Sequence, residues 1–500
     1  MRQEVFRMER VTYSEDGNTL LEDFNLNIFA GEVMGLVPLS GHGMQAFITL
    51  LKMNQPLDDG YVYYREEMVN SWRESKRNHN RISVIQDKSC LVEALTVADN
   101  IFVIRQGFSK RIMQPELLER QLAPFLEEIG IDIQADQYVE KLSAFKRVVV
   151  ELLRAVVAEH RLIVLTEIST LVGDAELQEL YRIMRHYAEK GFSFIYISPH
   201  FEEILQICDR ASIMMNGRIE KVIQKDEMKR EVLIDFTKEY DKLVRLHLAG
   251  KVERHAQTLP VFEAQAVTGQ YIRKFDFSVQ KGECLVIQSL NNRIFHDMLD
   301  IVTGERELSG GRLLIDGTEE TTRRNRSIAV IQELPTTSMI FPEMSYLDNL
   351  CFGLDHRLKT VWLKKGIKNS IMQEYGPTLG DEIFDQPIDE LSERQKYQLV
   401  YLRVLLQKPK VVFCVQPFKG ADLSHRKYIW ELLEIILKKG IAVVILAVNL
   451  ADSLSLADRL IRIDKDSHIE EYLQKDFASI PIIAPWLYIY QEQNHHSDES

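Results

Sequence analysis

Residues 31–45 read Gly-Glu-Val-Met-Gly-Leu-Val-Pro-Leu-Ser-Gly-His-Gly-Met-Gln, a short apolar run that leads into a glycine-containing loop. The stretch follows an amphipathic segment, Phe24 to Phe29, and begins with a Gly-Glu pair. A second pair, Gly282-Glu283, follows a similar segment, Phe275 to Val279, after an offset of 251 residues (282 minus 31). This recurrence indicates that the chain is built from two copies of one structural unit.

Further markers recur in the same order in both halves. Leu142-Ser143 is matched by Leu391-Ser392, with an offset of 249 residues (391 minus 142). After the Leu-Ser pair, each half continues with a helical pattern, an apolar run, a second apolar run, a predicted helix and an Asp-Arg pair. The matched segments are Leu162 to Leu165 with Val411 to Val415, Phe194 to Ile197 with Val443 to Leu446, and Asp209-Arg210 with Asp458-Arg459.

The spacing of apolar residues predicts the fold class. Short apolar runs alternate with helix-period segments, for example Pro115 to Ile129 and Ala175 to Lys190. This alternation predicts an α/β unit with a buried, mostly parallel sheet, preceded by a strand-rich portion. The predicted organisation is a first domain at 1–236, a linker at 237–257, a second domain at 258–480 and a C-terminal tail at 481–500.

Composition and charge narrow the classes of function. The 500 residues carry 61 basic and 74 acidic side chains, which give a formal charge of −13. This negative charge argues against non-specific binding to the phosphate backbone of nucleic acid. The five cysteines are widely scattered and lack metal-ligand spacing, which fits a reducing cytosol. The N-terminus lacks the features of a secretory signal, and no apolar stretch approaches the roughly 20 residues of a transmembrane helix. Any membrane role is therefore expected to be peripheral.

Several segments resemble a known family. Residues 95–102 read Leu-Thr-Val-Ala-Asp-Asn-Ile-Phe, and residues 196–198 and 208–210 read Tyr-Ile-Ser and Cys-Asp-Arg. Together with residues 403–415 and 417–422, they resemble the two cassettes of the ATP-binding subunits of bacterial carbohydrate ABC importers of the ribose, galactose and xylose type. The resemblance covers nearly the whole chain. It implies two tandem ABC-type nucleotide-binding domains with a P-loop NTPase-like fold, each with a mostly parallel sheet core, an N-terminal antiparallel β part and a helical subdomain.

The resemblance places residues 35–45 at the phosphate-binding loop. In such loops backbone amides cradle the nucleotide, a lysine contacts its β and γ phosphates, and a hydroxyl binds Mg²⁺. Gly41 and Gly43 match the last two glycines of the loop, but Met44 stands where the lysine belongs and Gln45 replaces the hydroxyl. These substitutions predict that ATP binding is weak or absent and that Mg²⁺ lacks its usual ligand.

Part of an anion-binding loop remains. Ser40, Gly41 and Gly43 leave part of a backbone nest, and His42 could add positive charge to it. The alternative is that His42 is an ordinary histidine of a surface loop. Tyr13 stands about where the family stacks an aromatic ring on adenine, and a role in the core is equally compatible with its position.

Other nucleotide-site positions of the first half are partly kept. Thr166-Glu167 replaces the family's Asp-Glu, so Glu167 is either a residue that orients water or an ordinary carboxylate at a strand end. Ser143 matches the serine of the family's signature motif, but the Gly-Gly-Gln that follows this serine in the family is replaced. Gln86 and His200 each lie one residue from the positions of the Q-loop glutamine and the switch histidine, and they complete the set of candidates.

The second half has lost more of the family's motifs. Residues 286–296, which align with the phosphate-binding loop, contain no glycine. Val415-Gln416 replaces both acidic residues, and Asn449 lies near the switch position, where there is no histidine. Hydrolysis is therefore not expected in this half.

The resemblance and the substitutions together predict a non-hydrolysing pseudo-ATPase that acts as an adaptor or regulator beneath a sugar permease. In the family the permease docks beside the Q-loop, which implies contacts at Gln86 to Val97 and Gln332 to Met344. The resemblance also implies a cytoplasmic place at the inner face of the membrane and no direct contact with the sugar. Two alternatives stay open: a working ATP-hydrolysing subunit that energises carbohydrate import, and a soluble regulatory protein without a permease.

Overall fold

The computed structural model divides into two compact units, Met1–Lys238 and Glu239–Ser500. The predicted linker at 237–257 and the predicted tail at 481–500 lie outside the residues that the structure describes. The described residues are 3–15, 17–75, 79–102, 115–228, 260–289, 292–319, 327–354, 365–450, 452–464 and 468–480.

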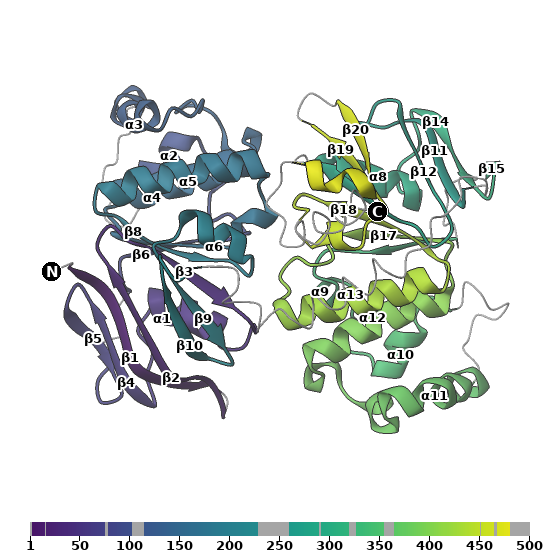
Figure 1. Ribbon diagram of the computed structural model, residues 1–500, viewed down its shortest axis with the longest axis horizontal. Coiled ribbons are helices and arrows are strands. Elements are labelled where there is room, and N and C mark those ends of the chain that lie inside the picture. Colours follow the sequence, from purple (N-terminus) through teal and green to yellow (C-terminus); the bar gives the residue numbers. More distant parts are fainter. Residues whose placement is uncertain are drawn as a thin grey trace, which may run out of the picture. The chain divides into compact units, whose positions relative to one another are not determined.

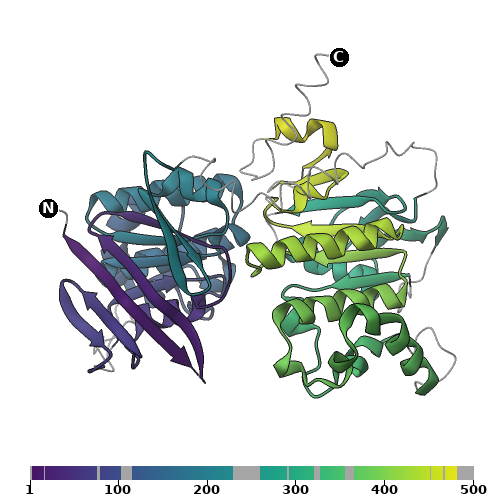
Figure 2. The ribbon, with the colours of Figure 1, turned by 60° about the horizontal axis from the view of Figure 1, so that its bottom comes forward.

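A four-stranded antiparallel sheet forms the N-terminal part of the first unit. Strands β1 (Glu4–Glu15) and β2 (Asn18–Phe29) pair along nearly their whole length and run side by side in dark purple (Figure 2). The other side of β1 pairs with β4 (Asp59–Tyr64), which in turn pairs with β5 (Glu67–Ser71). The predicted strand-rich portion is confirmed.

The second sheet of this unit has six strands in the order β10-β9-β3-β8-β7-β6. Neighbouring strands are parallel, except that β10 runs antiparallel to β9. The strands β7 and β8 bury every residue, because a parallel sheet covered on both faces has no solvent side. The strand bounds are β3 (Val33–Pro38), β6 (Ile82–Ile85), β7 (Leu162–Thr166), β8 (Ser193–Ile197), β9 (Arg210–Met215) and β10 (Arg218–Gln224).

Helices cover one face of the six-stranded sheet, and the antiparallel sheet with helix α1 (Met44–Lys52) covers the other (Figure 1). Neighbouring residues of β7 show this division, because Ile163 packs among the helices and Val164 packs on the opposite side. The predicted helices at 115–129 and 175–190 are confirmed as α3 and α5. The helices of the covering layer are α2 (Val97–Phe102), α3 (Pro115–Ile129), α4 (Ala144–Val157), α5 (Asp174–Glu189) and α6 (Phe201–Ile207).

The second unit repeats the sheet topology of the first. Its four-stranded sheet has the order β12-β11-β14-β15, and its six-stranded sheet has the order β20-β19-β13-β18-β17-β16. The latter corresponds strand for strand to the six-stranded sheet of the first unit. The bounds are β11 (Phe262–Thr268), β12 (Phe275–Val279), β13 (Cys284–Ser289), β14 (Gly310–Ile315), β15 (Thr318–Glu319), β16 (Ile328–Ile331), β17 (Val411–Val415), β18 (Ala442–Ala447), β19 (Arg459–Ile463) and β20 (Ile469–Leu473).

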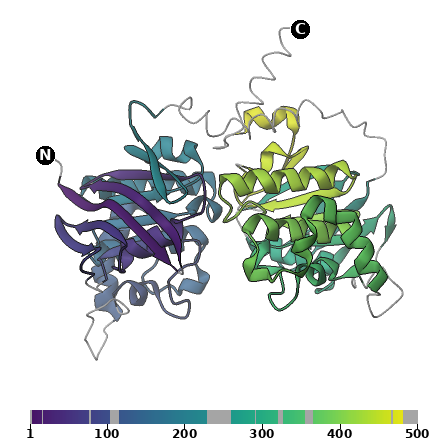
Figure 3. The ribbon, with the colours of Figure 1, turned by 90° about the horizontal axis from the view of Figure 1, so that it is seen from below.

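The helical layer of the second unit lies on the face of its sheet that is opposite the antiparallel strands. The green helices between residues 365 and 407 lie in front of this sheet when the molecule is seen from below (Figure 3). The helices of this layer are α9 (Pro335–Ser338), α10 (Tyr346–Cys351), α11 (Lys365–Leu379), α12 (Glu393–Gln407) and α13 (Leu423–Lys438). Helix α8 (Asn292–Thr303) packs with the antiparallel strands on the other face, as α1 does in the first unit.

One predicted helix of the second unit is not found in the described residues between β18 and Asp458. These residues form a single 3₁₀ turn at Ser453–Ser455, where the first unit has α6. Ser455 Oγ accepts a hydrogen bond from Trp430 Nε1 at 3.0 Å and donates to the carbonyl of Asp452 at 2.7 Å, and these bonds hold the tighter turn. No helix of the described residues is long and apolar enough to cross a membrane.

The Gly-Glu and Asp-Arg markers of the repeat touch one another within each unit. Arg210 Nε donates to Glu32 Oε1 at 2.6 Å, and Asp209 Oδ2 accepts from the amide of Val33 at 2.9 Å. These contacts join the start of β3 to the start of β9, its parallel neighbour. The same two contacts in the second unit join Arg459 to Glu283 at 2.5 Å and Asp458 to the amide of Cys284 at 2.8 Å.

Candidate functional site

The carboxyl ends of four parallel strands meet at one edge of the first unit's six-stranded sheet. The loop of residues 39–43 follows β3, His200 lies shortly after β8, Glu167 directly follows β7 and Gln86 directly follows β6. Since these four strands are neighbours, the edge brings the four predicted positions together. Ligands of open α/β sheets bind at such an edge.

The loop between β3 and α1 is fastened to neighbouring segments. Ser40 Oγ accepts a hydrogen bond from the amide of Asn216, in the turn between β9 and β10, at 2.8 Å. His42 Nε2 lies 2.9 Å from the carbonyl oxygen of Thr19 in β2. Both side chains therefore hold the loop in place, and His42 uses one ring nitrogen for this purpose.

Gly43 is buried where the loop enters α1 and has a left-handed backbone with φ 80. A Cβ atom at this position would lie 2.2 Å from the carbonyl oxygen of Leu20. Because the obstacle is backbone, only glycine fits here. Gly41 is exposed, and its carbonyl accepts from the amide of Met44 at 3.2 Å. Packing and hydrogen bonds to neighbouring segments thus fix the shape of this loop.

Met44 and Gln45 open helix α1. Met44 is partly buried and packs against the apolar core beneath α1, whereas Gln45 is exposed. Neither side chain offers the ammonium group or the hydroxyl that a Mg²⁺-nucleotide needs at this place. The donor set at these two positions does not fit that ligand.

Glu167 has a left-handed backbone with φ 57, which is uncommon outside glycine. Its carbonyl accepts from Thr170 Oγ1 at 2.7 Å, and its side chain is partly exposed. Gln416, at the same place in the second unit, has φ 41, so this backbone conformation belongs to the repeat. His200 is only 6% exposed at the start of α6, and its amide donates to Ser198 Oγ at 3.1 Å. Glu167 is the more accessible of the two catalytic candidates.

Ser143 and Tyr13 belong to elements outside the six-stranded sheet. Ser143 is the N-cap of α4, and its Oγ accepts from the amide of Lys146 at 3.3 Å. Tyr13 lies in β1, where it pairs with Leu21 and packs partly buried against the core. Each therefore has a structural role, and nucleotide contacts of either residue stay a prediction.

In the second unit, side chains of the protein link the carboxyl ends of β16 and β17. Gln416 Nε2 donates to Glu333 Oε1 at 2.6 Å, and Lys419 Nζ donates to Glu333 Oε2 at 3.1 Å. Gln288 in β13 is buried and donates to the carbonyl of Val448 at 2.9 Å. Sequence reasoning placed Glu333 in the segment Gln332 to Met344 and Lys419 in residues 417–422, but it missed their contact, which joins residues 86 positions apart.

A buried asparagine holds the segment after β6 in the first unit and the segment after β16 in the second. Asn100 in α2 is fully buried; its Oδ1 accepts from the amide of Val92 at 2.8 Å and its Nδ2 donates to the carbonyl of Val92 at 3.0 Å. Asn349 in α10 makes the same two bonds to Phe341, each at 2.9 Å. Val92 and Phe341 nevertheless expose 44% and 39% of their surface. The two segments implied to contact a permease are thus held in matching local shapes.

Glu151 fixes the first of these segments from α4. Its Oε1 accepts from Ser89 Oγ at 2.6 Å and from the amide of Cys90 at 2.9 Å. The side chain is buried, and this burial raises the pKa of Glu151, although both hydrogen bonds favour the ionised form.

Comparison with known proteins finds relatives of this chain among ABC transporters. Residues 21–170 match the family model described as ABC transporter. The ribose import ATP-binding protein of Geobacillus kaustophilus is 23% identical over 486 residues, which cover 94% of this chain and 96% of the relative. That of Shouchella clausii is 24% identical, with 91% and 93% covered. That of Clostridium perfringens (strain 13 / Type A) is 23% identical, with 96% and 97% covered.

These alignments extend over both units, and the matched model spans the loop after β3 as well as Gln86, Ser143 and Glu167. The repeated sheet order and the repeated marker contacts agree with a tandem arrangement. The chain is a relative of the tandem-cassette ATP-binding subunits of bacterial carbohydrate ABC importers, with altered residues at the nucleotide-site positions.

Proposed function

We propose that this chain is a cassette subunit of a carbohydrate ABC importer that has lost ATP hydrolysis and acts as an adaptor or regulator beneath the permease, at the inner face of the membrane. The observation that carries the proposal is Met44, which is apolar and packed against the core at the position of the phosphate-binding lysine. A pocket without this charge loses its main attraction for the nucleotide's β and γ phosphates.

The groups missing at Met44 and Gln45 are each comparable to a typical electrostatic contact in a catalytic site. Removing one preorganised group usually raises the barrier by about 3 kcal/mol, and each 1.4 kcal/mol or so lowers the rate tenfold. The missing ammonium group at Met44 and the missing hydroxyl at Gln45 together correspond to a loss of roughly 10⁴-fold. In the second unit, the contacts of Glu333 with Gln416 and Lys419 occupy side chains at the corresponding edge.

The permease contact is proposed for the two segments that the buried asparagines hold. Val92 and Phe341 occupy the same place in the repeat and expose apolar side chains. The ring of Phe341 packs at a tilt against that of Phe352, with centroids 4.4 Å apart, and Phe352 and Met344 are also exposed by 46% and 37%. Exposed apolar side chains gathered on a fixed backbone favour a protein partner. The sugar itself would contact other subunits.

The test is ATP binding and turnover by the purified full chain with Mg²⁺. Calorimetry would measure binding, and a phosphate-release assay would measure turnover by the wild type, by Glu167→Gln and by Glu220→Gln, which alters an exposed carboxylate of β10. We expect no turnover above the level of Glu167→Gln, because any activity shared by both samples is contamination. Turnover that Glu167→Gln abolishes and Glu220→Gln keeps would overturn the proposal.

A working ATPase is the second candidate, and one observation favours it. Glu167 is partly exposed at the edge where the loop after β3 and Gln86 also lie, so a carboxylate that could orient water is still present. The same assay decides between the two functions, since this candidate requires turnover that depends on Glu167.

A further inference from the structure

The second unit contains a cavity of about 770 Å³ at the amino-terminal edge of its parallel sheet, far along the strands from the nucleotide-site positions. Its walls come from the starts of β17 and β18, the ends of α12 and α13, and helix α11. This volume lies within the roughly 300–1,000 Å³ that small-molecule sites occupy.

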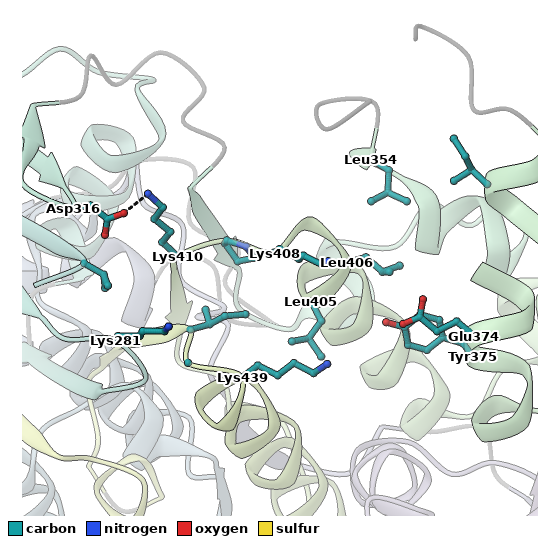
Figure 4. Close-up of a pocket in the computed structure, with 15 residues that line it drawn as sticks. Lys281, Asp316, Leu354, Glu374, Tyr375, Leu405, Leu406, Lys408, Lys410 and Lys439 are labelled. Carbon is teal, nitrogen blue, oxygen red and sulfur yellow. Dashed lines mark hydrogen bonds and ion pairs between the residues drawn. The ribbon is translucent and has the colours of Figure 1, made fainter. Parts of the chain in front are cut away.

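The cavity has a basic part and an apolar part. Lys281 and the pair Lys410–Asp316 lie at one end, and Glu374 with Tyr375 lies at the other (Figure 4). The apolar residues that line the cavity include Leu354, Ile367, Leu405, Leu406 and Ile441.

The lysines of the cavity differ in whether they have an ion-pair partner. Lys410 is neutralised by Asp316, but the described residues provide no ion-pair partner for Lys281, Lys408 or Lys439. The stem of Lys281 lies against Gly440, where a Cβ atom would come 2.8 Å from Lys281 Cε. The lining holds four lysines against two carboxylates, Asp316 and Glu374, so the cavity keeps an excess of positive charge in a chain whose net charge is −13.

In the first unit, the lysine at the corresponding position has a carboxylate partner. Lys190 corresponds to Lys439, with an offset of 249 residues (439 minus 190), and each precedes a left-handed glycine. Lys190 and His186, in and after α5, both contact the carboxylate of Glu128 at the end of α3. In the second unit, Ile435 stands at the position of His186, and the described residues offer Lys439 no carboxylate partner.

We propose that this cavity binds a small organic phosphate ester with an apolar body. The phosphate lies among Lys281, Lys408 and Lys439, and the apolar body lies against Leu405, Leu406 and Tyr375. Lysine binds phosphate as a point charge, so the site does not demand the planar geometry that arginine pairs impose. The proposal is independent of nucleotide chemistry at the first unit.

The test measures binding of 1-naphthyl phosphate to the full chain by titration calorimetry, beside inorganic phosphate and 1-naphthol as the separate head and body. We expect saturable binding of the ester, weaker binding of both fragments, and weakening at higher ionic strength. The double variant Lys281→Gln/Lys439→Gln should lose at least tenfold in affinity. These side chains are exposed, so the variant should fold, and its circular dichroism would verify this.

Two control variants locate the bound ester. Lys438→Gln removes a neighbouring charge that is 71% exposed and paired with Glu434, and it should leave the affinity unchanged. His42→Asp places a negative charge at the exposed loop after β3 and should also have no effect. The proposal is overturned if the wild type shows no saturable binding, if Lys438→Gln weakens binding as much as the double variant, or if His42→Asp alone abolishes it.

Discussion

Two buried carboxylates, Glu32 and Glu283, hold the central strand of each unit against its neighbour. The side chain of Glu32 is 1% exposed and that of Arg210 is 12% exposed, so their attraction acts where water screens it little. A buried ion pair adds little net stability compared with apolar side chains, but its loss on one side leaves an uncompensated charge. The sequence showed both markers without indicating that they touch, because 178 residues separate them.

The residue-scale prediction concerns this ion pair. Glu32→Ala should lower the free energy of unfolding of the first unit by about 3–5 kcal/mol, because Arg210 stays buried without its counter-charge. Urea denaturation would measure the change. The matched control is Glu22→Ala, which removes the exposed partner of Arg218 and should cost about 1 kcal/mol or less. Equal effects of the two variants would contradict the argument.

The roles of some nucleotide-site residues follow from their identity, whereas the roles of others depend on contacts with residues far away in the sequence. The losses at Met44 and Gln45 could be predicted, since a side chain's chemistry is fixed by its identity. The packing roles of Ser40 and His42 could not, because their partners come from β2 and from the turn after β9. The network of Glu333 and Lys419 was missed for the same reason.

At the scale of elements, strands that are apolar throughout were the most predictable. Val411 to Val415 was predicted and observed as β17, because complete burial requires an unbroken apolar run. The helix predicted before Asp458 was wrong for the described residues, because the bonds of Ser455 favour a 3₁₀ turn. The serines of the two Leu-Ser pairs cap α4 and α12, a structural reason for their recurrence.

The two capping serines give an element-scale prediction. Ser392 forms a capping box with Gln395, whose Oε1 accepts from the amide of Ser392 at 2.8 Å, whereas Ser143 caps α4 with one bond at 3.3 Å. Ser392→Ala should cost about 1–2 kcal/mol and Ser143→Ala less, about 0.5–1 kcal/mol. Hydrogen exchange over residues 393–407 and 144–157 would measure the opening of each helix. A larger effect at Ser143 would contradict the structure.

The start of α13 should make the second unit sensitive to pH. A hydrogen bond to Asp422 raises the pKa of His425 above its ordinary value of 6.5, although burial and Arg394 oppose this and Glu393 adds to it. Since the folded pKa is the higher one, the stabilisation is complete below about pH 6.5 and is lost as the pH rises through the folded value. Urea unfolding should show this loss in the wild type, and His425→Gln should remove this part of the pH dependence. An unchanged slope in the variant would assign the effect to another group.

At the scale of the whole molecule, the internal repeat allowed the fold and the two-unit organisation to be predicted. The same order of apolar strands occurs in both halves of the sequence, and each half forms a buried parallel sheet with the same strand order. The cavity at the amino-terminal edge of the second sheet could not be predicted. It depends on which partner a lysine finds in space, as the contrast between Lys190 and Lys439 shows.

The whole-molecule prediction concerns membrane recruitment. When the chain is coexpressed with a sugar permease of this importer class, the wild type should copurify with membranes, and Val92→Asp/Phe341→Asp should shift it to the soluble fraction. A charge placed at an apolar contact is costly to bury, so each aspartate should weaken the contact with the permease. Both segments are altered because each is proposed to contact the permease. The control Met68→Asp/Ile435→Asp changes equally exposed apolar residues elsewhere and should stay with the membranes. A wild type that never sediments with the permease would support the soluble regulator instead.

The place of β3 in the middle of its sheet has a consequence for synthesis on the ribosome. β3 is made early, but its two neighbours, β8 and β9, begin at residues 193 and 210. Until those residues emerge from the exit tunnel, the backbone N–H and C=O groups along both edges of β3 have no native partner, and such long-range pairing makes folding slow. We therefore expect chaperones to bind the nascent first unit during most of its translation.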